Sequence, residues 1–192
     1  MLSQFSFRSS EIKGINSKQT LKDLFNVPPD VYPVGRLDYD SEGLLILTND
    51  TALNHRLLHP SFAHEREYWV QVEGVINQHA LDQLQSGIMI TVDGKPYVCK
   101  KARTEIFDAD PIVPQRIPPV RFRKNIPTSW IRLILTEGKN RQVRKMTAKA
   151  GFPTLRLIRY RISRLTLHGS DPGTIRELDR NEIYGLLFKS KD

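Results

Sequence analysis

The stretch GRLDYDSEGLLILTND, residues 35–50, defines the local order of elements around it in this chain of 192 residues. Branched and aromatic residues predict a strand over 31–38, and the apolar run that follows predicts a second strand over 44–48. Between them, residues 40–43 (Asp-Ser-Glu-Gly) are types typical of a turn. Asp50 then stands where an N-cap is needed, so the stretch predicts strand, turn, strand and helix in succession.

Outward from this stretch, helices and strands continue to alternate. Asn77 and Gly87 bound a helix as its N-cap and C-terminal stop. Asp93-Gly94 lies between two short apolar runs and predicts a hairpin. The remaining expected elements are a helix over 17–26, strands over 67–73, 88–92, 96–99 and 130–135, a helix over 139–150, a strand over 154–162, and a last helix that begins with Asp179 and Glu182.

This order of elements predicts the α+β class. We expect a single domain over 1–192, because no long Gly/Ser linker and no internal repeat divides the chain. The Pro-rich segment near 107–127 is the only candidate boundary between two lobes with a cleft between them.

The basic residues are unevenly distributed along the chain. The net charge is +8, but residues 1–99 sum to −4 and residues 100–192 sum to +12. Lys139–Arg164 holds nine basic residues and no acidic one. Such clustering predicts a surface for a polyanion, because Lys and Arg that neutralise phosphates release condensed counterions. The alternative is a solvated basic face that keeps the protein soluble.

Composition excludes several classes of protein. With 39% apolar and 26% charged residues, the chain is neither a disordered tail nor a fibre. No apolar run approaches the ~20 residues that span a bilayer, and the N-terminus lacks the apolar stretch of a signal peptide. Cys99 is the only cysteine, which fits a reducing compartment. We therefore expect a cytoplasmic protein.

Asp38, Asp40 and Glu42 form the densest acidic cluster. Their spacing imitates the first half of a calcium loop, but the twelfth position is Asn49 instead of a bidentate Glu. A magnesium nuclease built on the same three acids is a further hypothesis. A third gives the chemistry to Asp38 alone, at a strand end facing a cleft, and a fourth is an Asx turn.

Other candidate motifs are weaker. His55 and His59 have the i, i+4 spacing of metal ligands, but no third ligand is evident and a structural pair is favoured. Gly138-Lys139 lacks the spacing of a phosphate-binding P-loop. No Ser or Cys carries a nucleophile signature.

The expected helix over 139–150 is amphipathic in an unusual way. Apolar positions recur at helical spacing from Val143 to Ala150, and the other positions carry Arg141, Arg144 and Lys145. Like charges at these spacings destabilise an isolated helix by a few tenths of a kcal/mol per pair. Phosphates or carboxylates opposite the helix would offset that cost.

Three blocks in this order resemble the RsuA-like bacterial ribosomal pseudouridine synthases. They are the stretch 35–50, the segment REYWV at 66–70, and the segment EGKNRQVRKM at 137–146. The later run GFPTLRLIRY, 151–160, together with IPTSW at 126–130, is most similar to the E-type branch that acts on the large ribosomal subunit.

The resemblance implies a fold and a reaction. The fold would be a mixed, mostly antiparallel sheet with flanking helices around a central cleft. The activity would be cofactor-free and metal-free isomerisation of one uridine of 23S ribosomal RNA to pseudouridine, by a protein we expect to be a monomer. A non-catalytic RNA-binding or ribosome-assembly factor derived from this fold is the alternative.

The resemblance also implies roles for individual residues. Asp38 aligns with the essential aspartate, which acts as nucleophile or as base, Tyr68 with the tyrosine that packs against the target base, and Arg144 with the partner of the aspartate. The expected RNA contacts are Arg36, Lys139, Arg141, Gln142, Lys145, Arg156 and Arg159.

The chain departs from the family pattern at its N-terminus. Family members usually begin with a strand that ends in Asn-Lys-Pro just before the equivalent of residues 2–5. That strand is expected to be missing here, which puts folding and activity in question, and no S4 RNA-binding domain is expected.

Overall fold

Three long strands with alternating apolar residues form the centre of the molecule. A computed structural model describes residues 20–120 and 125–188. In it, β4 (Arg66–Glu73) lies between β8 (Thr128–Leu135) and β9 (Thr154–Ile162) and is antiparallel to both. Short strands extend the sheet: β7 (Arg103–Ile106) on β8 and β10 (Leu165–Thr166) on β9.

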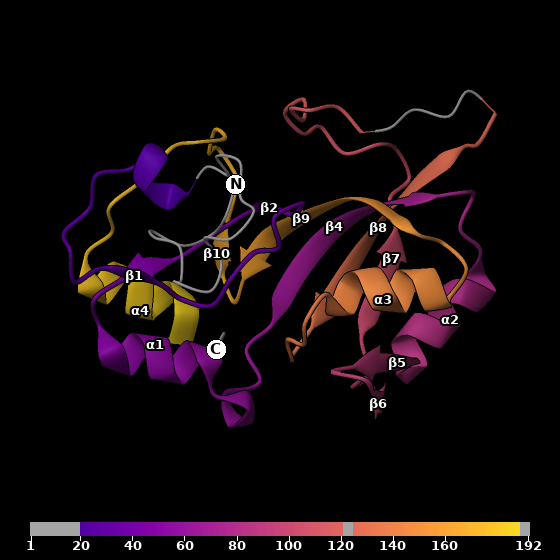
Figure 1. The fold of residues 1–192 in the computed structure, drawn as a ribbon, viewed down its shortest axis with the longest axis horizontal. Coiled ribbons are helices and arrows are strands. Elements are labelled where there is room, and N and C mark those ends of the chain that lie inside the picture. Colours follow the sequence, from indigo (N-terminus) through magenta and orange to yellow (C-terminus); the bar gives the residue numbers. More distant parts are fainter. Residues whose placement is uncertain (1–19, 121–124, 189–192) are drawn as a thin grey trace.

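One further strand makes the sheet mixed. β2 (Glu42–Gly43) pairs with β9 in the parallel direction, whereas every other pair in this sheet is antiparallel. The expectation of a mixed, mostly antiparallel sheet is therefore confirmed. β2 brings the stretch 35–50 against the centre of the sheet (Figure 1).

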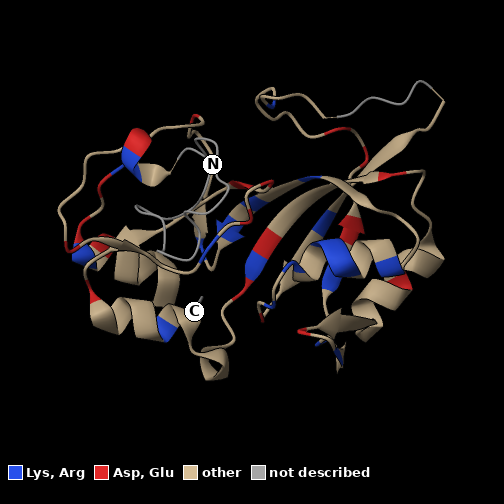
Figure 2. Ribbon diagram, in the orientation of Figure 1, with Lys and Arg blue, Asp and Glu red and all other residues tan. Residues whose placement is uncertain are grey.

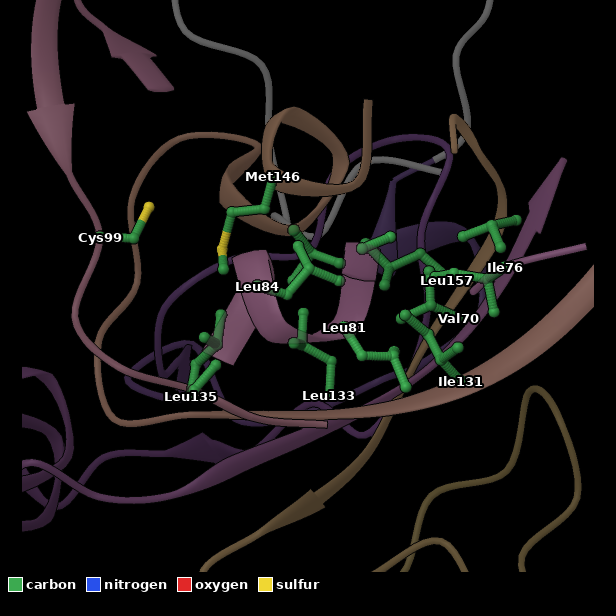
Figure 3. Packing of buried hydrophobic residues seen from close by; sticks show 14 of the residues in the cluster. Val70, Ile76, Leu81, Leu84, Cys99, Ile131, Leu133, Leu135, Met146 and Leu157 are labelled. Atoms are coloured by element: carbon green, nitrogen blue, oxygen red, sulfur yellow. The ribbon is translucent and has the colours of Figure 1, made fainter. Parts of the chain in front are cut away.

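Two helices cover one face of this sheet and close the larger core. α2 (Gln78–Ser86) and α3 (Gln142–Lys149) pack there together with the hairpin of β5 (Met89–Val92) and β6 (Lys95–Val98). Figure 3 shows Leu84 and Met146 of the two helices meeting the strand residues. The most enclosed side chains of this core include Val70, Val72, Leu84, Ile131, Leu133, Leu135 and Met146. No helix in the described ranges is long and apolar enough to cross a membrane.

A second cluster of buried residues lies at the other end of the molecule. α1 (Thr51–Leu58), α4 (Arg180–Phe188) and the pair of β1 (Tyr32–Pro33) with β3 (Leu47–Thr48) surround it. Figure 1 shows this lobe on the left and the α2–α3 lobe on the right, with β4 and β9 running between them. The Pro-rich segment does not separate the two, because β7 before it and β8 after it pair in one sheet.

Most element predictions that rest on local signals are confirmed. Asp50 accepts hydrogen bonds from the N–H groups of Ala52 and Leu53 at the start of α1. Asn77 caps α2, and Gly87 ends it in the left-handed region. The Asp93-Gly94 hairpin is present, and β9 has the predicted bounds.

Other element predictions are wrong or lie outside the described residues. The strand expected over 31–38 is reduced to β1, and the one expected over 44–48 to β3. Strands β7 and β10 are not among the predicted elements. The helix expected over 17–26 is wrong for the residues that are described: residues 17–19 lie outside them, and residues 20–26 hold only a 3-10 turn at Leu21–Asp23.

Candidate active site

A cleft of about 680 Å³ opens between the 34–42 segment, the start of β4 and the segment 135–143. It lies where the two lobes meet on β4 and β9 (Figure 1). Seven of the ten site residues expected from the sequence line it: Arg36, Asp38, Tyr68, Lys139, Arg141, Gln142 and Arg159.

A turn presents Asp38 to this cleft. The N–H of Ser41 donates to the Asp38 carbonyl at 3.0 Å, and the Ser41 hydroxyl donates to Asp38 Oδ2 at 3.4 Å. The same Oδ2 lies 3.7 Å from Arg141 Nη1 and 3.9 Å from Arg144 Nε. The carboxylate side chain is 27% exposed, so it is reachable from the cleft and faces two positive charges.

The two arginines lie closer to Asp40 than to Asp38. Arg141 forms a two-pronged contact with the Asp40 carboxylate at 2.8 and 3.0 Å, and Arg144 Nη2 donates to the Asp40 carbonyl at 2.7 Å. The hydrogen bond from Arg141 is the main cause that lowers the pKa of Asp40. Asp40 thereby fixes both guanidinium groups near Asp38.

Tyr68 faces the cleft because of the alternation along β4. Val70 and Val72 on its face are fully buried in the larger core, and Tyr68 is the next residue on that face toward the strand's start. It is partly buried and lines the cleft together with Asp38. The expectation that 67–73 forms a strand with two distinct faces is confirmed, since Trp69 stacks on Tyr160 on the opposite face.

Two carboxylates of the acidic cluster, Asp40 and Glu42, are bound to arginines. Glu42 receives two hydrogen bonds from Arg156, at 3.0 and 2.7 Å, and an ion pair from Arg116 at 3.1 Å. With Asp40 bound to Arg141, the calcium and magnesium hypotheses each lose two of their three carboxylates. Within the described ranges no group of three His, Cys, Asp or Glu side chains is arranged to hold a metal ion.

Gln142 supports the cleft wall from inside. It is 3% exposed; its amide nitrogen donates to Glu137 at 2.6 Å, and its oxygen accepts from the N–H of Lys139 at 3.0 Å. α3 begins at Gln142 and not at Lys139, because Arg141 adopts the left-handed conformation with φ 51°. Lys139 and Arg141 stay exposed on the turn before the helix.

Two of the arginines expected to contact RNA are buried in the fold. Arg156 and Arg159 are 7% and 6% exposed. Arg156 bonds Glu42 and the carbonyl of Pro114, whereas Arg159 bonds the carbonyls of Leu44 and Arg36. Neither guanidinium is presented to solvent, so this structure gives both a role inside the protein.

Strand register explains why the basic residues of β9 separate. Tyr68 pairs with Arg159, but Glu67 pairs with Arg161, so Tyr160 is an extra residue in a β-bulge. The bulge reverses the alternation: Arg159 faces the cleft with Tyr68, and Arg161 faces Glu67 on the other side. The order of apolar and basic residues along β9 gives no sign of this bulge.

Four further cleft residues had no assigned role in the sequence-based site: Arg66, Tyr97, Lys100 and Glu137. Arg66 precedes Tyr68 by two residues on a strand, so period-two alternation is the signal that predicts it on the same face. Tyr97 and Lys100 come from the β5–β6 hairpin and its exit, which only the tertiary fold brings to the cleft.

Comparison with known proteins identifies the family over most of the chain. Residues 11–149 match the family model described as RNA pseudouridylate synthase. The chain is similar to proteins named ribosomal large subunit pseudouridine synthase E, with 45% identity to that of Vibrio parahaemolyticus over 88% of this chain and 68% of the relative. The identity is 49% for that of Xanthomonas axonopodis pv. citri, over 84% of this chain and 80% of the relative.

Solved structures show the same fold. A crystal structure of a pseudouridylate synthase matches with a TM-score of 0.71 and 27% identity, over 88% of this chain and 65% of the other. A Cbf5-Nop10-Gar1 complex matches with a TM-score of 0.52 at 14% identity, over 76% of this chain and 44% of the other, which shows a likeness of fold alone.

Proposed function

The chain belongs to the RNA pseudouridylate synthase family, and from that premise we propose that it isomerises one uridine of 23S ribosomal RNA to pseudouridine. The relatives that share 45–49% identity are named as large-subunit enzymes, which supports this choice of RNA. The single observation that carries the chemistry is the position of Asp38, a reachable carboxylate that faces Arg141 and Arg144 in a cleft lined by Tyr68.

The cleft suits a base taken out of its RNA helix. A uridine inside folded RNA hides its glycosidic bond, so the nucleotide must flip into a pocket at a cost of a few kcal/mol. Tyr68 offers a ring against which the uracil stacks, and stacking of this kind contributes about 1–3 kcal/mol. The binding energy of the base thus offsets the cost of extracting it.

The reaction breaks the N1–C1′ bond, turns the uracil and joins C5 to C1′, after which C5 loses its proton to solvent and N1 gains one. Asp38 either attacks the ribose or uracil as a nucleophile or removes a proton from the sugar. Both roles need the ionised carboxylate. Arg141 and Arg144 place positive charge within 4 Å of it, and the Asp40 contacts hold both arginines there.

Exposed basic residues around the cleft are proposed to contact RNA phosphates. Arg36, Lys139 and Arg141 are exposed at its rim, and Lys145 lies partly exposed on α3. All the proposed groups come from one chain, so we propose that a monomer is active. Because its RNA is part of the ribosome, the proposed place of action is the cytoplasm.

Replacement of one carboxylate oxygen tests this function. Asp38→Asn keeps the size of the side chain but removes its negative charge, so we expect no measurable pseudouridine and nearly unchanged RNA binding. The assay follows release of tritium from unmodified 23S transcript labelled at C5 of uridine, and a pseudouridine-specific chemical method locates the product.

Asp93→Asn is the matched control, because Asp93 lies in the β5–β6 turn and does not line the cleft. It should turn over like the wild type. Turnover by Asp38→Asn at the wild-type rate would refute the assigned role of Asp38, and a wild type that releases no tritium from 23S transcript would refute the proposed substrate.

A further inference from the structure

Arg159 is the most enclosed charged residue at the cleft and has no part in the chemistry described above. Only 6% of the residue is exposed, and burial lowers the pKa of its guanidinium. Removing a charged group from water costs free energy unless polar groups compensate for the lost hydration. The groups that bind Arg159 therefore indicate its role in the protein.

The side chain of Arg159 joins the two ends of the segment that carries Asp38. Its Nε donates to the carbonyl of Leu44 at 2.7 Å, and its Nη1 donates to the carbonyl of Arg36 at 3.4 Å. Arg36 precedes Asp38 by two residues, and Leu44 closes the segment after β2. One planar guanidinium thus spans the base of the turn that presents the catalytic carboxylate.

The main chain of Arg159 holds the same segment. Its carbonyl accepts from the N–H of Leu44 at 2.9 Å, next to the parallel pairing of Gly43 with Arg159. Side chain and main chain of one residue therefore fix the 36–44 segment to β9. A lateral shift of this strand position would move Asp38 with it.

The same guanidinium also lies beside Tyr68. Tyr68 is the strand neighbour of Arg159 on β4, and its side chain is close enough to favour the charged form of the guanidinium. The bulge at Tyr160 keeps Arg159 on this face and sends Arg161 to the opposite one. Arg159 is thus in contact with both parts of the site, the Asp38 segment and the base platform.

The burial of one guanidinium nitrogen argues against a contact between Arg159 and an RNA phosphate. Nη2 is buried and forms no hydrogen bond with any described residue. Burial lowers the pKa of the guanidinium, nearby Tyr68 raises it, and the cation Arg66 lowers it further. A surface phosphate cannot reach a nitrogen that is closed to solvent, so binding RNA backbone does not explain this residue.

On the basis of the proposed function, we infer that Arg159 is a positioning residue, which fixes the distance between Asp38 and Tyr68 by clamping the 36–44 segment against the tyrosine. It acts through these two groups and touches no RNA phosphate. A misplacement of about 1 Å of a reacting group can cost about 100-fold in rate, so the clamp should affect kcat and leave RNA affinity intact.

Three variants separate positioning from mere stability. Arg159→Met keeps most of the volume but removes the charge and all donors. Arg159→Lys restores a cation with a single donor atom that cannot span Leu44 and Arg36. Arg161→Met is the matched control, because Arg161 lies two residues along β9, is bound to Glu65 and Glu67, and faces away from the cleft.

The measurements are kcat and KM for tritium release from unmodified 23S transcript, the Kd for that RNA, and the thermal unfolding midpoint of each variant. We expect Arg159→Met to lose about 100-fold in kcat, with Kd within about three-fold of the wild type. Arg159→Lys should recover part of the loss. Arg161→Met should lower the unfolding midpoint but keep the wild-type kcat.

Each outcome decides the inference. Wild-type kcat in both Arg159 variants would overturn it, and so would a weakened Kd with unchanged kcat, which would make Arg159 an RNA contact. Equal kcat losses in Arg159→Met and Arg161→Met would reduce it to general stability. If Arg159→Met does not fold, the folded Arg159→Lys decides by its kcat. Failure of the proposed function is distinct, since the wild type would then show no turnover.

Discussion

Glu137 is a buried carboxylate whose charge is held mainly by hydrogen bonds. It accepts from the Tyr97 hydroxyl at 2.5 Å, the N–H of Lys100 at 2.9 Å and the Gln142 amide at 2.6 Å. Burial raises the pKa of Glu137, but these bonds outweigh it and the net shift is downward. The network ties the β5–β6 hairpin to the start of α3, so it fixes one wall of the cleft.

This network predicts a specific loss of stability at alkaline pH. The hydrogen bond to Glu137 is the main cause that raises the pKa of Tyr97 to about 12. In the unfolded chain the same phenol titrates near 10. The folded state then keeps its proton while the unfolded state loses it, so stability falls as the pH rises between these two values.

We expect Tyr97→Phe to lower the free energy of unfolding at pH 7 and to lose less stability than the wild type above pH ~10. The gap between the two proteins should shrink by no more than about 1.4 kcal/mol per pH unit, since Tyr97 is partly exposed. Denaturant unfolding at several pH values measures it. Tyr32→Phe, an exposed tyrosine in β1, is the control; a constant gap for Tyr97→Phe would contradict the assignment.

At the scale of elements, the sequence was sufficient wherever a short-range signal determines the structure. Asp50 and Asn77 start their helices through side-chain caps that depend only on the next three residues. The Asp93-Gly94 turn fixes its hairpin in the same way. These features were predictable because the groups that stabilise them lie within a few residues of one another.

Elements that depend on distant partners were not predictable. β1 and β3 pair over two residues only, and β2 exists through its parallel contact with β9. The bulge at Tyr160 follows from the register with β4. The sequence places Arg156, Arg159 and Arg161 on one basic strand, but register and burial decide which groups they meet.

Gly43 is the residue at which this contact between β2 and β9 can be tested. Its φ is 110°, and a Cβ there would lie 2.4 Å from the Arg159 carbonyl oxygen and 2.6 Å from the Arg159 nitrogen. Main-chain atoms cannot move aside cheaply, so Gly43→Ala should destabilise the fold by about 2–4 kcal/mol.

Gly94→Ala provides the comparison, because Gly94 also has a positive φ of 76° but open space around it. Its cost should be only the conformational strain of about 1 kcal/mol. Chemical denaturation gives both values. If the two alanine variants lost equal stability, the packing of β2 on β9 would not be tight.

At the scale of the whole molecule, the fold brings part of the uneven charge of the sequence into ion pairs. Acidic residues of the first half meet arginines of the second: Asp40 with Arg141, Glu42 with Arg156, and Glu67 with Arg161 and Arg132. Figure 2 shows red and blue segments alternating across the central strands. The net charge of +12 over residues 100–192 therefore does not form one continuous basic face.

Only part of the candidate site could be predicted from the sequence. Asp38, Tyr68 and Arg144 belong to the three motifs, and the fold brings the first two to one cleft, with Arg144 Nε 3.9 Å from Asp38 Oδ2. That Arg144 binds Asp40 more closely than Asp38 depends on the turn at 38–41. Burial of Arg156 and Arg159 depends on three strands that are far apart in the chain, so composition could not separate them from exposed basic residues.

This difference between exposed and buried cations predicts the salt dependence of RNA binding. Each phosphate contact contributes about 0.7–0.9 to the slope of log K against log salt concentration. Lys139 is exposed at the cleft rim, so Lys139→Gln should reduce that slope by about this amount. Arg156 is bound to Glu42 and Pro114, so Arg156→Met should leave the slope unchanged although it lowers the unfolding midpoint.

Binding of unmodified 23S transcript between about 50 and 200 mM salt measures the slopes. An equal reduction for both variants would show that Arg156 leaves Glu42 and reaches a phosphate when RNA binds, which would restore the role that the sequence indicated.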